Sequence, residues 1–193
     1  INKLFFEVLI AKDYTPEALG ILRQKKNRIL LIRKDKALPT VIVKNSLNGF
    51  LVQDRDMTTI TAADFEMKTS RVPTSQEAAD VIFGDTVVKH LKSNGIAIVK
   101  NGQLIGSGVG QTSRIDAMKQ AMQKADHHGF SLKGSVLASD AFFPFADSVE
   151  MAHQAGIEVV VEPGGSLRDE DTINFCETEG MCLIFTGLRH FKH

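Results

Sequence analysis

The chain has 193 residues, 43% of them hydrophobic, which suits one large domain or two small ones with a real core. Its 23 basic and 23 acidic residues cancel and the pI is about 7.2, so the strongly basic character typical of nucleic-acid-binding domains is missing. No apolar stretch reaches the about 20 residues that a membrane span needs, and the two cysteines make neither a disulfide framework nor a zinc pattern. We therefore expect a cytoplasmic protein with no bound metal and no nucleic-acid or membrane partner.

The first 73 residues predict a short αβ unit followed by a linking arm. Residues 5–11 (FFEVLIA) indicate a buried strand, and Thr15 followed by Pro16 is typical of the N-cap and first position of a helix. An apolar run over residues 28–32 predicts a second strand. The remainder alternates only weakly and carries turn signals, so we expect a hairpin or an extended arm there.

A second unit is expected over residues 74–193. Thr74 and Glu77 form the Thr-x-x-Glu pattern of a capping box, which predicts that a helix starts there. Two apolar runs flank Asn101-Gly102, and this pair favours a type I′ turn because both residues tolerate positive φ, so we expect a β-hairpin. The elements that follow are predicted to alternate: helix 113–128, strand 135–138, helix 147–155, strand 157–161, helix 168–179 and strand 182–186.

This order of elements predicts an α/β fold. Short helical crossovers give parallel strands with right-handed connections, whereas the hairpin adds an antiparallel pair. We expect a three-layer α/β/α sandwich around a mixed sheet with one hairpin, and this arrangement resembles the cytidine-deaminase-like fold. The zinc ligands of those deaminases, a His-x-Glu and a Pro-Cys-x-x-Cys, are absent from the sequence, which excludes zinc deaminase chemistry.

Three phenylalanines surround a proline in residues 138–145 (ASDAFFPF), directly after a predicted strand. An open α/β sheet binds ligands at the carboxyl ends of its strands, and a flat ligand could stack on aromatic rings at that place. The rings are either core residues or a ligand platform, and the residues alone favour neither interpretation. Asp140 could cap this turn or hold a ligand amine.

Three other segments are candidates for binding. Residues 106–114 (GSGVGQTSR) lie between a predicted strand and a predicted helix, where glycines let the backbone approach a ligand and Arg114 suits a phosphate or carboxylate. A purely structural turn is the alternative. Residues 162–166 (EPGGS) occupy a similar position, with a helix cap as the alternative, and residues 185–193 (FTGLRHFKH) form a basic tail. Asn94 is a turn former unless it points into the cleft.

Several of these segments together resemble the bifunctional purine-biosynthesis family that couples AICAR transformylase to IMP cyclohydrolase. The similar stretches are IAKDY at 10–14, LVQDRD at 51–56, KSN at 92–94, KNGQ at 100–103, GVGQTSR at 108–114, ASDAFFPF at 138–145, PGGS at 163–166 and TGLRHFKH at 186–193. The resemblance covers essentially the whole chain and implies the C-terminal part of the transformylase region. The start at Ile1, without methionine, suggests a piece of a longer protein, although tag removal or methionine processing would give the same start.

The resemblance implies formyl transfer from 10-formyltetrahydrofolate to AICAR, which gives formyl-AICAR in IMP biosynthesis. The chain would then belong to a phosphoribosylaminoimidazolecarboxamide formyltransferase, with the folate as cosubstrate. The transformylase region of that family has two deaminase-like halves and works as an intertwined dimer. Residues 1–73 would be the end of the first half plus the arm, residues 74–193 would be the second half, and we expect a homodimer because a separated half exposes apolar surface.

The resemblance also implies roles for individual residues. The AICAR nucleotide would be contacted by Asn94, Arg114, Phe142 and Arg189. The folate side would be lined by Ser113, Ile115, Pro144, Phe145, Asp147 and Gly165. Asn94 and the last residue, His193, would be the catalytic residues within this chain. Ala146 departs from the arginine that the family often has at this position.

The main catalytic pair of the family, a Lys-His followed by Val-Ser-Pro-Ala-Gly, is missing from the sequence, and the resemblance implies that the cyclohydrolase domain is missing too. In the family that histidine takes the proton from the amine, and the loss of a positioned acid–base group commonly costs about 10²–10⁴-fold in rate. We therefore expect this polypeptide alone to be inactive. A non-catalytic nucleotide- or folate-binding or dimerisation module is the alternative. A different hydrolase is disfavoured, because the spacing reveals no metal set and no nucleophile–base pair.

Overall fold

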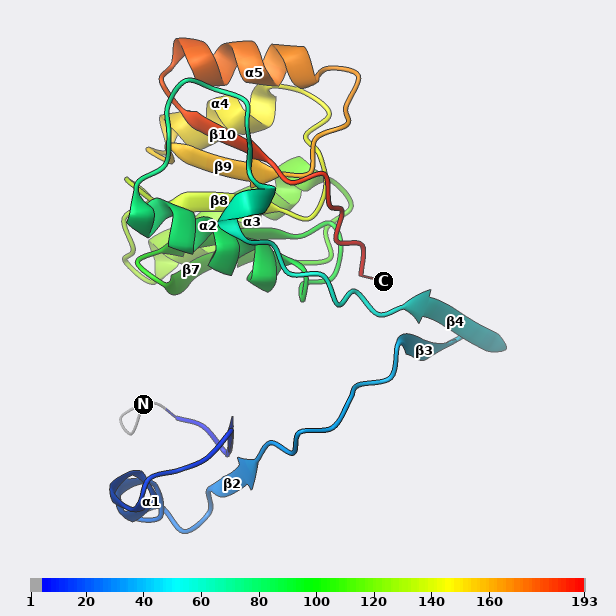
Figure 1. Cartoon of the computed structure of the whole chain (residues 1–193), viewed down its shortest axis with the longest axis vertical. Coiled ribbons are helices and arrows are strands. Elements are labelled where there is room, and N and C mark those ends of the chain that lie inside the picture. Colours follow the sequence, from blue (N-terminus) through cyan, green and yellow to red (C-terminus); the bar gives the residue numbers. More distant parts are fainter. Residues whose placement is uncertain (1–4, 193) are drawn as a thin grey trace. The chain divides into compact units, whose positions relative to one another are not determined.

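The computed structural model describes residues 5–192, and the chain divides into two compact units that meet between Arg55 and Asp56 (Figure 1). Within the described residues, no helix has both the length and the apolar character required to cross a membrane.

The unit boundary differs from the expected division after residue 73. β5 (Glu66–Met67) pairs antiparallel with β10 (Cys182–Phe185), and the Leu183 N–H donates to the Thr69 hydroxyl at 3.0 Å. Residues 56–73 therefore pack as an edge of the second unit. A strand of two residues has too little periodicity to be recognised in the sequence.

The first unit contains two small pairs of strands. β1 (Val8–Ala11), α1 (Pro16–Leu22) and β2 (Ile29–Ile32) follow one another as the sequence predicts, and the structure shows that β1 and β2 pair in parallel. β3 (Val41–Ser46) and β4 (Gly49–Asp54) form an antiparallel hairpin, which is one of the two forms expected for the arm.

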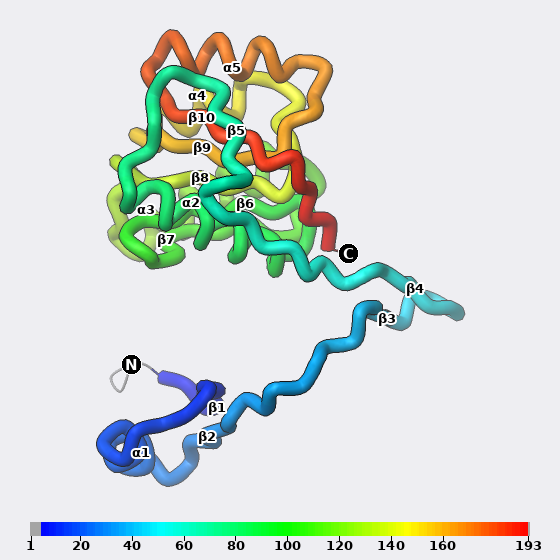
Figure 2. Tube along the Cα trace, in the orientation of Figure 1, coloured from blue at the N-terminus to red at the C-terminus, as the bar shows by residue number. Residues whose placement is uncertain are grey.

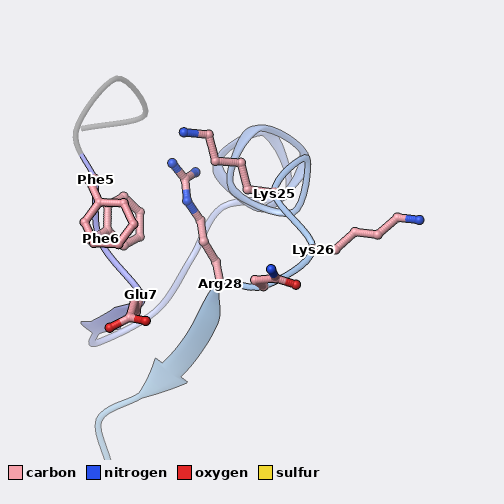
Figure 3. A pocket seen from close by; sticks show the side chains of 7 residues that line it. Phe5, Phe6, Glu7, Lys25, Lys26 and Arg28 are labelled. Carbon is pink, nitrogen blue, oxygen red and sulfur yellow. The ribbon is translucent and has the colours of Figure 1, made fainter.

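Most apolar side chains of this unit are exposed. Among its described residues, 5–55, only Leu22 is buried. Parallel strands are normally covered on both faces, and β1 and β2 lack such cover within the first unit. The basic run after α1 lines a hollow in which the Arg28 guanidinium lies 4.2 Å from the centre of the Phe6 ring (Figure 3). The exposed large apolar residues up to position 55 are Phe5, Val8, Ile10, Ile21, Ile29, Leu31, Ile32, Leu38, Val41, Val43, Leu47, Phe50, Leu51 and Val52.

The second unit is built on a six-stranded mixed sheet in the order β5-β10-β9-β8-β6-β7. β8, β9 and β10 are parallel, β6 runs antiparallel to β8, and β6 and β7 form the predicted hairpin, which confirms the expected mixed sheet. The elements not yet given are η1 (Ala62–Asp64), α2 (Ser75–Val88), β6 (Ile96–Lys100), β7 (Gln103–Gly108), α3 (Arg114–His127), β8 (Val136–Ser139), α4 (Asp147–Gln154), β9 (Val159–Glu162) and α5 (Asp169–Thr178).

Helices cover both faces of this sheet, which makes the three layers that the sequence predicts. α2 packs on one face, where Val159 and Val161 of β9 point, whereas α3, α4 and α5 pack on the other face, where Val160 points. Because strands buried on both sides need apolar residues throughout, β8, β9 and β10 are almost continuously apolar.

The strand register brings the loops of interest to one edge of the sheet. Ile96 at the start of β6 pairs with Ser139 at the end of β8 and with Gly108 at the end of β7. Since β8, β9 and β10 are parallel, the segments that follow them emerge at this same edge, and Figure 2 shows the tail leaving β10 there. We call this end of the sheet, where β8, β9 and β10 finish, the carboxyl edge.

Candidate functional site

The aromatic loop, residues 140–146, leaves β8 at the carboxyl edge and divides its rings between two roles. Phe143 is 1% exposed and belongs to the core under α4, while Phe145 is 49% exposed and Phe142 is partly exposed. Phe143 is therefore a core residue, whereas Phe142 and Phe145 are available as a ligand platform.

Each exposed ring of the aromatic loop is paired with an arginine. The Arg189 guanidinium lies 4.9 Å from the centre of the Phe142 ring, and the Arg168 guanidinium lies 5.0 Å from the centre of the Phe145 ring. The electron-rich face of an aromatic ring attracts a cation placed over it, so each guanidinium stabilises its position above the ring. The carboxyl edge thus carries two adjacent combinations of a flat apolar surface and a positive charge.

Arg114 connects several predicted site residues. One guanidinium nitrogen, Nη2, donates to Asn94 Oδ1 and to Asp140 Oδ1, each at 2.9 Å, and Nη1 donates to the Phe142 carbonyl oxygen at 3.2 Å. The side chain is only 12% exposed. Arg114 therefore holds the loops together, and most of its donors are already used inside the protein.

Asn94 and Asp140 complete this network. The Asn94 amide also donates to the Gln111 carbonyl oxygen at 2.9 Å, so both ends of its side chain have partners within the chain. The second oxygen of Asp140 accepts the Gly95 N–H at 2.9 Å, and the residue is fully buried. The Asp140 carboxylate thus connects the aromatic loop to Gly95 and Arg114, a role that differs from the turn cap considered from the sequence.

The glycine-rich segment has a structural explanation for its first two glycines. A Cβ at Gly106 would lie 2.2 Å from the Ala121 carbonyl oxygen, and one at Gly108 would lie 1.7 Å from the Ala117 carbonyl oxygen. These glycines let α3 lie directly on β7. The Ser113 hydroxyl accepts the Asp116 N–H at 3.1 Å and caps α3. The Asp116 carboxylate thus lies in the first turn of the helix, where a ligand anion would otherwise bind.

The turn after β9 needs both of its glycines. Gly164 has φ +70°, and a Cβ there would lie 2.4 Å from the Phe185 ring. Gly165 has φ +96°, and a Cβ there would lie 3.2 Å from Arg189 Nη2. This predicted folate-side glycine therefore leaves room for the arginine that covers Phe142.

The tail after β10 is fixed to the carboxyl edge. The His190 N–H donates to the Asp140 carbonyl oxygen at 2.9 Å, and Ser93 and Lys192 exchange hydrogen bonds at 3.0 and 3.2 Å. His190 is 2% exposed, with Nδ1 2.5 Å from Asp56 Oδ2 and Nε2 3.1 Å from Asp85 Oδ1. Arg189 is thereby presented from an ordered segment. The expected catalytic residue His193 lies outside the described residues.

The remaining residues expected on the folate side surround the start of two helices. Ser113 and Ile115 flank Arg114 at the start of α3, while Pro144 and Phe145 are exposed in the aromatic loop and Asp147 opens α4. Ala146 is the N-cap residue of α4 and supplies no side-chain cap. These residues lie in the two segments that Arg114 joins.

Sequence reasoning named Glu162 only as part of the candidate segment 162–166, and it assigned no individual role to Arg168, Asp56 or Asp85. Glu162 ends β9 after three valines, is 1% exposed, and accepts the Phe143 N–H through Oε2 at 2.6 Å. Burial raises the pKa of Glu162 to about 8, against smaller opposing effects of the Phe143 N–H and Arg114. A glutamate at the end of an all-valine strand is the signal that could have identified it.

Comparisons with known proteins agree on one family. A model described as the AICARFT/IMPCHase bienzyme matches residues 1–124. The whole chain is 54% identical to the bifunctional purine biosynthesis protein PurH of Bacteroides thetaiotaomicron, 47% identical to that of Aquifex aeolicus and 49% identical to that of Clostridioides difficile. In each case it spans 38% of the length of the relative.

Two solved structures show a more distant similarity. The apo dCMP deaminase of cyanophage S-TIM5 has a TM-score of 0.41 and 21% identity, over 51% of this chain and 88% of the other. A diaminohydroxyphosphoribosylaminopyrimidine deaminase/reductase of Thermotoga maritima has a TM-score of 0.40 and 18% identity, over 55% of this chain and 34% of the other. The family itself rests on the sequence matches: the chain belongs to the AICARFT/IMPCHase bienzyme family.

Proposed function

We propose that this chain serves the formyl transfer of the bienzyme: it binds the AICAR nucleotide and 10-formyltetrahydrofolate at the carboxyl edge. The observation that carries the proposal is the pair of exposed rings, each with its own cation, in one loop. Phe142 with Arg189 suits an imidazole ring with a phosphate. Phe145 with Arg168 suits a pterin ring with carboxylates. Aromatic rings stack on flat heterocycles, and guanidinium groups bind phosphate and carboxylate.

The reaction needs a proton acceptor, and the Lys-His pair that the resemblance implies for this role is missing from the sequence. The AICAR amine attacks the formyl carbon, the bond from that carbon to the folate N10 breaks, the amine loses a proton and N10 gains one. His190 is buried between two carboxylates and cannot reach a substrate. This supports the expectation that the chain alone binds ligands but turns over at least about 10²-fold more slowly than a complete enzyme.

Calorimetry on the 193-residue chain tests the assignment of the two rings. Phe142→Ala should weaken the binding of AICAR and Phe145→Ala the binding of a non-transferring 10-formyltetrahydrofolate analogue, each by roughly 5- to 150-fold, because stacking contributes about 1–3 kcal/mol. Phe130→Ala is the matched control, because Phe130 is 36% exposed and precedes β8 at the opposite edge of the sheet. Equal loss in all three variants, or none, would refute the assignment.

Two rival functions give different results in the same preparation. If the chain serves the cyclohydrolase reaction instead, it should convert formyl-AICAR to IMP, which our proposal excludes. If it is a non-catalytic dimerisation module, it should bind neither ligand. The first unit exposes many apolar residues, and such surfaces are usually buried against another protein. We therefore expect a homodimer. A monomer in light scattering would disprove this expectation.

A further inference from the structure

The peptide group between Phe142 and Phe143 is held at both of its polar ends. Arg114 Nη1 donates to the carbonyl oxygen of Phe142 at 3.2 Å, and the N–H of Phe143 donates to Glu162 Oε2 at 2.6 Å. The C=O and N–H of one trans peptide point in opposite directions, so the two side chains hold it from opposite sides.

Both holding groups are themselves fixed in the fold. Arg114 is held by Asp140 and Asn94, as described above, and Glu162 is the last residue of the central strand β9. The aromatic loop is thereby connected to α3 on one side and to the sheet on the other.

This peptide group decides which phenylalanine is buried. The two side chains are identical and adjacent, so their chemistry cannot choose between them. With the carbonyl toward Arg114 and the N–H toward Glu162, Phe143 is 1% exposed in the core, and Phe142 lies 4.9 Å beneath the Arg189 guanidinium. Loss of either hydrogen bond would remove one of the two contacts that fix this orientation of the peptide group.

We propose that Glu162 is a positioning residue for the ligand site, which acts through the Phe142–Phe143 peptide group and keeps the Phe142 ring at the surface. The inference rests on the proposed function in naming the ligands, but the contact itself does not. Glu162 is 1% exposed, so we assign its carboxyl group a role through the peptide group and no direct ligand contact.

The ionisation of Glu162 provides a readout of this contact. The groups that face it are the Arg114 guanidinium from α3, Asp169 and Cys176 from α5, and the Phe143 N–H. Burial raises the pKa of Glu162 to about 8 and that of the Cys176 thiol to about 12, so of these two groups Glu162 is the one that should change charge between pH 7 and pH 9. The Phe143 amide should report that change.

NMR on the ligand-free 193-residue chain tests the contact. In the wild type, the Phe143 amide shift should titrate near pH 8 and its exchange should be protected. Glu162→Gln keeps an acceptor without a titrating charge, so protection should persist while the titration disappears. Glu162→Ala should lower the protection of Phe143 at least tenfold, and the exposed Glu170→Ala should change neither. No titration in the wild type, or unchanged protection in Glu162→Ala, overturns the proposal.

Ligand binding separates this inference from the proposed function. If the wild type binds AICAR, Glu162→Ala should weaken that binding about as much as Phe142→Ala, and Glu162→Gln should restore it. Unaltered affinity in Glu162→Ala would overturn the positioning role. If the wild type binds neither ligand, the proposed function fails, while loss of protection at Phe143 would still support the role of Glu162 in the loop. If Glu162→Ala does not fold, the titrations of the wild type and Glu162→Gln decide.

Discussion

Removal of His190 should destabilise the second unit strongly. His190 is 2% exposed and lies between Asp56 and Asp85, and its replacement by alanine leaves the Asp85 carboxylate, 5% exposed, without its imidazole partner. Asp85 Oδ2 already lacks a hydrogen-bond partner within the described part of the chain. Breaking a buried ion pair by removing one partner costs about 3–5 kcal/mol. We expect a loss of that size for His190→Ala.

Urea denaturation followed by circular dichroism measures this loss, because α2 to α5 all belong to the second unit. His190→Ala combined with Asp85→Asn should be less destabilised than the sum of the two single variants, since the second change removes the unpaired charge; a coupling of at least about 1 kcal/mol is expected. His127→Ala, at an exposed position on α3, controls for the loss of a histidine and should stay within about 0.5 kcal/mol of the wild type.

The pH dependence of the same measurement has a defined sign. Burial by itself lowers the pKa of His190, but the hydrogen bonds and charges of Asp85 and Asp56 outweigh it and raise the pKa above its usual value. The stabilisation is therefore fully present below pH about 6.5, the ordinary value for histidine, and is lost as the pH rises through the folded-state pKa. A stability of His190→Ala equal to that of the wild type, with the same pH slope, would refute this account of the tail.

Two further substitutions test a close packing contact of Gly164 and a pair of hydrogen bonds of Asp80. Gly164→Ala should destabilise by about 2–4 kcal/mol, because the new Cβ would lie 2.4 Å from the Phe185 ring, whereas Gly134→Ala has the same φ of +70° in open space and should cost only about 1 kcal/mol; equal urea midpoints would contradict the clash. Asp80→Ala should cost about 3 kcal/mol, because its carboxylate accepts both N–H groups of the β6–β7 turn at 2.8 and 2.7 Å. An unchanged midpoint, matching exposed Asp126→Ala, would contradict that role.

The sequence predicted best what depends on neighbouring residues. The capping box at Thr74 and Glu77 opens α2 as expected, and Asn101 and Gly102 take φ values of +52° and +72° in the hairpin turn. Both signals arise from contacts within four residues, where the chain itself enforces proximity. Continuous apolar runs likewise located the parallel strands of the second unit, because burial on both faces of a sheet requires apolar residues throughout.

Contacts between residues far apart in the sequence could not be predicted from local sequence patterns. Asp56 and His190 are separated by 134 positions, and no local pattern indicates that they meet. Gly106 and Gly108 illustrate a different difficulty: a glycine signals that something approaches the backbone closely, but not whether it is a ligand or a helix. Here the close neighbour is α3, and the glycine-rich segment contributes to the candidate site mainly through Arg114.

The aromatic loop combines both kinds of information. The sequence alone indicates that its rings are too many for a strand end, but it cannot say which ring faces outward, because Phe142 and Phe143 are chemically the same. That choice is made by a backbone group held between Arg114 and Glu162, which come from separate elements. In the proposed site, the outward ring is therefore positioned partly by Glu162, a buried residue to which we assign no ligand contact. For the same reason, substitutions at Glu162 should change binding without removing any surface that a ligand contacts.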